Sequence, residues 1–120
     1  MATNIRYEDG NQLEVAPTAP TSTTITAGQA CLVGSLPGVA LTDASDTVGN
    51  GGVCTVKFNG VADLAVKGET TTNAAVAAGD ILYLDGAVVN KDSSNGVRFG
   101  YALGAVASGA TTTIPVKIGY

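Results

Sequence analysis

The sequence predicts a small all-β domain, a barrel or sandwich of roughly eight short strands, on three observations. Short apolar runs are separated throughout by glycine and by Asn-Gly or Asp-Gly pairs, which is the spacing of strands joined by tight turns. No segment shows a sustained helical period. The chain of 120 residues is 45% hydrophobic but only 5% aromatic, so it suffices for one domain with a core of small side chains.

Two segments are expected, an extended N-terminal arm at residues 1–24 and a β-rich domain at residues 25–120. Pro17, Pro20 and the Thr/Ser-rich stretch at residues 18–24 favour extended backbone over a packed core element.

The arm nevertheless contains two short alternating stretches. Ile5 and Tyr7 lie on either side of Arg6, and Leu13 and Val15 lie on either side of Glu14. Each stretch could pair as a strand, either with the sheet of its own chain or with a neighbouring protein.

In the first half of the domain, residues 30–41 are expected to supply two short strands, with a type II turn over Leu36–Val39. Residues 53–66 are expected to form a hairpin. A three-residue loop, Phe58-Asn59-Gly60, buries the apolar side chains on one face, whereas a two-residue turn does not. The alternative is one long strand with a glycine bulge at Gly60.

In the second half, residues 72–78 are alanine-rich and precede Gly79, which fits a short helix, a single turn or a loop. Residues 81–90 are expected to form a hairpin with a type I′ turn at Asp85-Gly86. That register pairs Leu84 with Ala87 and leaves one wholly apolar face, which consists of Leu82, Leu84, Ala87 and Val89.

Two half-buried strands are expected near the C-terminus, joined around Ser108-Gly109. The apolar residues that alternate in them are Val97, Phe99, Tyr101 and Leu103 in the first, and Ile114, Val116 and Ile118 in the second. Pro115 has no N–H to donate, which indicates an edge strand.

Composition excludes several classes of function. A net charge of −4 with six scattered Lys and Arg residues argues against a nucleic-acid surface. The absence of His removes the commonest general base. No apolar stretch approaches the roughly 20 residues of a membrane helix, and the N-terminus has no apolar core typical of a signal peptide.

Few residues suggest a reactive site. Cys31 and Cys54 are interpreted as two buried free thiols, with a single disulfide as the alternative. Asp43 and Asp46 precede a glycine-rich stretch and are interpreted as turn residues rather than calcium ligands. No catalytic residue, metal or cofactor is predicted.

Five stretches, taken in order, resemble the capsid decoration, or cement, proteins of tailed bacteriophages. They are residues 27–40 (AGQACLVGSLPGVA), 56–61 (VKFNGV), 78–84 (AGDILYL), 100–102 (GYA) and 114–118 (IPVKI). Each stretch alone consists of ordinary turn and strand residues, so the ordered series carries the resemblance.

The resemblance implies a structural protein on the exterior of the virion, made in the host cytoplasm. Such a protein binds the major capsid protein of the expanded capsid, clamps adjacent capsomers and is often a trimer. It implies no catalytic residue. The N-terminal segment of such proteins often contacts the shell, which makes the alternating residues of this arm the candidate contacts: Ile5, Arg6, Tyr7, Leu13 and Val15.

Two other classes of function compete with this one. A carbohydrate- or receptor-binding module would use exposed tyrosines, for which the candidates are Tyr7, Tyr83, Tyr101 and Tyr120. A small hydrolase or cofactor enzyme would need a reactive group such as Cys31 or Cys54, for which no supporting base is in view.

Overall fold

A computed structural model of the chain describes residues 11–70 and 75–119. It confirms the all-β class, with nine strands in two sheets. The strands are β1 (Gln12–Val15), β2 (Ala30–Val33), β3 (Leu36–Ala40), β4 (Cys54–Lys57), β5 (Val61–Lys67), β6 (Ile81–Asp85), β7 (Val88–Asn90), β8 (Val97–Ala102) and β9 (Thr111–Ile118). Within these residues no helix is long and apolar enough to cross a membrane.

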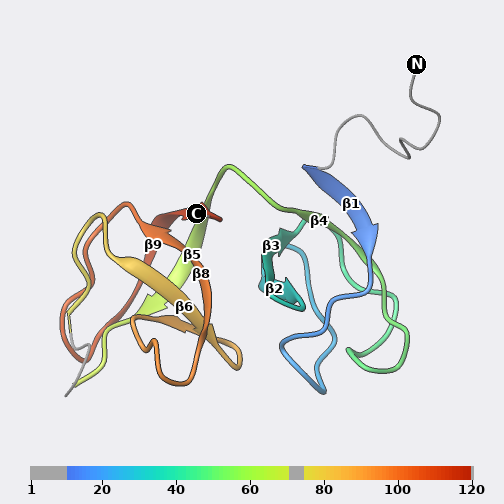
Figure 1. The fold of residues 1–120 in the computed structure, drawn as a ribbon, viewed down its shortest axis with the longest axis horizontal. Coiled ribbons are helices and arrows are strands. Elements are labelled where there is room, and N and C mark those ends of the chain that lie inside the picture. The colour runs from blue at the N-terminus through green and yellow to red at the C-terminus, as the bar shows by residue number, and fades with distance from the viewer. Residues whose placement is uncertain (1–10, 71–74, 120) are drawn as a thin grey trace.

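The first four strands form one sheet in the order β1-β4-β3-β2, and the last five close into a barrel in the order β5-β7-β6-β8-β9. The two bodies lie side by side along the long axis, joined by the segment that runs from β4 to β5 (Figure 1). Residues 12–15 of the expected arm therefore pair with the chain's own sheet. The division of the chain at residue 24 stays a prediction.

The expected hairpin at residues 53–66 is wrong. β4 pairs with β1 and β3, whereas β5 pairs with β7 and β9, so the two strands belong to different sheets. Phe58, Asn59 and Gly60 join the sheets instead of reversing the chain (Figure 1). The alternation of apolar residues was read correctly, but it does not specify which strand lies beside another.

The hairpin of residues 30–41 exists, but its turn was misplaced. Leu32 pairs with Pro37 and Val33 with Leu36, so Gly34 and Ser35 form the turn and Pro37 lies inside β3. Gly34 has a φ of +62°, which places glycine first in the two-residue loop, as a type II′ turn requires.

The β6–β7 hairpin also exists, with its register shifted by two residues. Leu84 pairs with Val89 and Asp85 with Val88, so Gly86 and Ala87 form the turn, with Gly86 at a φ of +60°. A shift of two preserves the faces. Leu84 and Val89 are accordingly buried as expected, whereas Ala87 is exposed.

The two C-terminal strands are present and pair with each other, but β9 is not an edge strand. It lies between β5 and β8 in the closed barrel. Pro115 is tolerated because β8 ends opposite it. The N–H of Leu103 donates to the Pro115 carbonyl (2.9 Å). The pair therefore lacks only the second hydrogen bond, which would need an N–H on Pro115.

A bulge changes the expected faces of β8. Its register against β6 shifts between Leu82 and Tyr83, so β8 carries one extra residue. Phe99 and Ala102 are both fully buried, whereas Tyr101 lies on the outer wall. Of the expected apolar face through Val97, Phe99, Tyr101 and Leu103, only Phe99 is buried, so that expectation is wrong.

Buried side chains form two clusters that share the first sheet. Ala30, Leu32 and Val39 pack with the interior of the barrel. Cys31 lies on the opposite face of the sheet and belongs to a second cluster, which includes Ile25 and Val48. Both faces of β2 and β3 are thus covered, which explains the continuous apolar run in β2.

Residues 75–78 of the helix candidate are not helical, which fits the alternative of a single turn or a loop. Val76 forms an isolated bridge with Val106, and Gly79 donates to the Ala102 carbonyl (2.7 Å). The remainder of that candidate, together with residues 1–10 and 120, lies outside the described residues.

Candidate functional site

Of the predicted contact residues, the structure describes Leu13 and Val15, both in β1. Leu13 lies opposite Val56 and Val15 opposite Cys54, and both side chains are half-buried. Val15 packs against the second cluster. Ile5, Arg6 and Tyr7 lie outside the described residues, so the structure does not bring the five candidates together.

Within the described residues, one edge of β1 has no neighbouring strand and is open. β1 is the terminal strand of its sheet and, among the residues that the structure describes, pairs only with β4. Phe58 donates its N–H to the Asn11 carbonyl (2.8 Å), so Asn11 faces β4. The backbone N–H and C=O groups of successive residues in a strand point to alternate sides. Those of Gln12 and Glu14 therefore point away from the sheet. Such an edge accepts a further strand.

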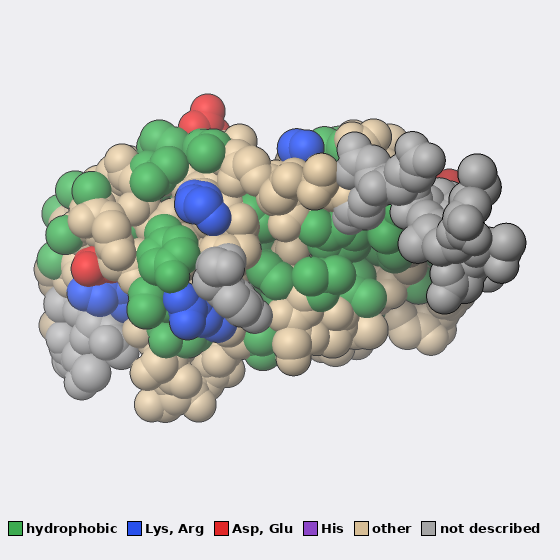
Figure 2. Space-filling model, turned by 45° about the horizontal axis from the view of Figure 1, so that its top comes forward, with side chains coloured by type: hydrophobic (Ala, Val, Ile, Leu, Met, Phe, Trp, Pro, Cys, Tyr) green, Lys and Arg blue, Asp and Glu red, His purple; other side chains and the backbone are tan. Residues whose placement is uncertain are grey.

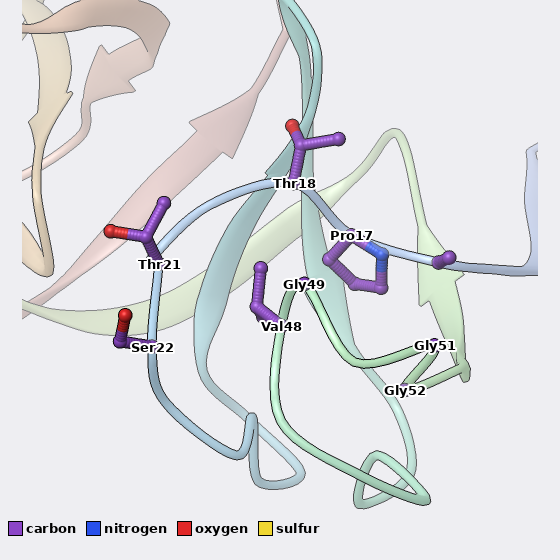
Figure 3. A pocket seen from close by; sticks show the side chains of 9 residues that line it. Pro17, Thr18, Thr21, Ser22, Val48, Gly49, Gly51 and Gly52 are labelled. Atoms are coloured by element: carbon purple, nitrogen blue, oxygen red, sulfur yellow. The ribbon is translucent and has the colours of Figure 1, made fainter.

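A cavity of about 470 Å³ lies between the segment that follows β1 and the glycine-rich loop (Figure 3). Its lining consists of Ala16, Pro17, Thr18, Thr21, Ser22, Val48, Gly49, Gly51 and Gly52. This set has no ionisable and no aromatic side chain, so the cavity offers neither acid–base chemistry nor a stacking platform for a sugar. The Thr18 hydroxyl accepts from the Gly34 N–H (2.7 Å) and donates to the Leu32 carbonyl (3.3 Å), which attaches this segment to β2.

Both cysteines are buried free thiols, as interpreted from the sequence. They lie in the same apolar cluster. Burial, reinforced by the neighbouring Cys54, raises the pKa of Cys31 to about 12, and burial also raises the pKa of Cys54. Both groups stay protonated at neutral pH and are therefore poor nucleophiles.

The two aspartates of the glycine-rich loop serve the backbone. Asp46 accepts a hydrogen bond from the Thr47 N–H (2.7 Å), as expected of a turn residue. Asp43 accepts from the Ala27 N–H (2.8 Å) and so joins two loops that are distant in sequence. In residues 11–70 and 75–119, no group of three or more potential metal-ligating side chains occurs.

One polar cluster was missed by the sequence reasoning. On the outer barrel wall, Arg98 Nη2 donates to the Tyr101 hydroxyl (2.6 Å), and the Lys117 Nζ lies 5.9 Å from the centre of the same ring. Residues 98 and 101 share a face only because of the bulge in β8. The adjacent Gly100 was the one signal in the sequence that indicated it.

Comparison with known proteins identifies one family. A family model described as phage cement protein matches residues 7–118 of the chain, which includes every described strand. No curated protein and no solved structure matches the chain.

Proposed function

Because the chain belongs to the phage cement protein family, a family of structural capsid proteins, we propose that it decorates the outer surface of the mature capsid. There it binds the major capsid protein and bridges adjacent capsomers. The protein is made in the host cytoplasm and acts on the virion exterior as a homo-oligomer, with a trimer favoured.

The open edge of β1 is the observation that supports shell binding best. An extended segment of the capsid protein adds to this edge and bonds to the outward backbone groups of Gln12 and Glu14. The half-buried Leu13 and Val15 then contact side chains of the added strand. Ile5, Arg6 and Tyr7 extend the contact along the shell.

Stabilisation of the shell follows from mass action. A ligand that binds only the mature lattice shifts the equilibrium toward that lattice. An oligomer presents several such edges at once, so weak individual contacts combine into tight binding.

Co-sedimentation with mature and immature shells tests the proposal, and the variant Glu14→Pro tests its mechanism. Proline at this position removes a donor on the open edge while leaving the bonds to β4 intact. We expect bound copies per mature shell to fall about tenfold or more, whereas Glu14→Ala binds like the unmodified protein.

Two results would contradict the proposal at different levels. If the unmodified protein fails to sediment with mature shells, the decoration role is wrong. If it sediments and Glu14→Pro does so equally well, the β1 edge is not the contact.

A further inference from the structure

A row of side chains crosses the outer wall of the barrel over four neighbouring strands. The pairing register places Ile81 (β6) beside Tyr101 (β8), Tyr101 beside Lys117 (β9), and Lys117 beside Val61 (β5). Arg98 extends the row, with its guanidinium carbon 5.5 Å from the centre of the Tyr101 ring. We call these five residues the barrel row.

The barrel row has the composition of a protein interface. Val61 is 60% exposed and Ile81 is 37% exposed, although both are large aliphatic residues. Between them stand an aromatic ring and two cations, on a chain whose net charge is −4. Tyrosine and arginine are enriched where interfaces bind most strongly. Figure 2 shows hydrophobic side chains adjoining Lys and Arg side chains on the barrel.

Lys117 determines the charge that a partner surface must carry to bind the barrel row. The two ion pairs in the described part of the chain join Lys67 to Glu69 (3.6 Å) and Lys91 to Asp80 (3.1 Å), and neither uses Lys117. Its ammonium lies over the Tyr101 ring, where a partner that covered the row would desolvate it. The complementary surface must therefore offer a carboxylate.

The same chain carries a matching surface on the next side of the barrel. Among the residues that the structure describes, β5 and β7 pair only at Val66 and Val89, and no strand pairs with the first half of β5 on that side. A groove of about 200 Å³ lies there, with small residues such as Gly28, Ala30 and Ala65 in its lining. Its one carboxylate belongs to Asp63, which is exposed.

We propose that the barrel row of one copy docks on the β5 groove of a second copy, with Lys117 paired to Asp63. The inference rests on the homo-oligomer of the proposed function and identifies the surfaces that hold it together. The contact joins two different surfaces, and the proposed trimer requires that its repetition closes into a ring around a rotation axis. Val61 lies two residues from Asp63 on β5, which places both near that axis.

Sedimentation equilibrium of the free protein, at low and at high salt, tests the contact. We expect Lys117→Asp and Asp63→Lys each to raise the dissociation constant of the oligomer about tenfold or more, and the double variant to restore assembly. Val61→Asp weakens assembly similarly. The control Leu36→Asp, which changes an exposed residue of β3 in the other sheet, assembles like the unmodified protein.

Several outcomes would overturn the inference. They are a free protein that is monomeric at every concentration, Lys117→Asp and Asp63→Lys variants that assemble normally, or a double variant that is no better than either single one. Unchanged assembly of Lys117→Asp with lost shell binding would assign the barrel row to the shell instead. An oligomer held by the row that fails to bind shells refutes the decoration role and leaves this inference standing.

Discussion

Single glycines determine where strands approach each other closely. A Cβ atom on Gly100 would collide with the backbone carbonyl of Lys117, and one on Gly38 would collide with the side chain of Val56. Glycine at these positions allows β8 to lie close to β9 and β3 to lie close to β4. Neither position therefore tolerates a side chain without movement of the backbone or of its neighbour.

We therefore expect Gly100→Ala to lower the free energy of unfolding by roughly 1–3 kcal/mol, the usual cost of overpacking a core. Urea denaturation measures the difference. Thr113→Ala, on the exposed face of β9, serves as the control and should stay within about 0.5 kcal/mol of the unmodified protein. An unchanged midpoint for Gly100→Ala would mean that the β8–β9 contact is looser than described.

The buried thiol of Cys31 makes stability depend on alkaline pH. The pKa of Cys31 is raised by burial and by Cys54 from 9.0 to about 12 in the folded state. The unfolded chain then binds fewer protons than the folded chain between these values, so stability falls as pH rises from 9 toward 12. Unfolding midpoints of the unmodified protein should decline over that range more steeply than those of Cys31→Ala. Parallel pH profiles of the two proteins would contradict this.

At the scale of elements, most strands could be predicted and most of their partners could not. The alternation in residues 81–90 correctly indicated a hairpin and, apart from Ala87, its buried face. Its turn was misplaced because Asp85-Gly86 and Gly86-Ala87 are both acceptable two-residue turns, and a shift of two leaves the faces unchanged.

The β6–β7 turn gives a direct test of the observed register. Gly86 has a φ of +60°, so alanine there should cost about 1–2 kcal/mol of stability. Asparagine enters this conformation more readily and should cost less. Denaturation of Gly86→Ala and Gly86→Asn measures both effects, and equal losses would indicate that a positive φ is not the requirement.

At the scale of the whole molecule, long-range pairing was the part that sequence patterns could not determine. The strands at residues 54–57 and 61–67 have apolar faces that would match in a hairpin, yet each strand belongs to a different sheet. The candidate site was affected in the same way. Leu13 and Val15 were found through their alternation, whereas the barrel row depends on a bulge and on cross-strand neighbours that no local pattern indicates.

The central claim is that this protein stabilises a capsid by binding its exterior. The most direct measurement is the temperature at which phage particles release their DNA, before and after the protein is stripped and added back. We predict that stripped particles open at a lower temperature and that added protein restores the original value. Equal opening temperatures for stripped and decorated particles would contradict the claim.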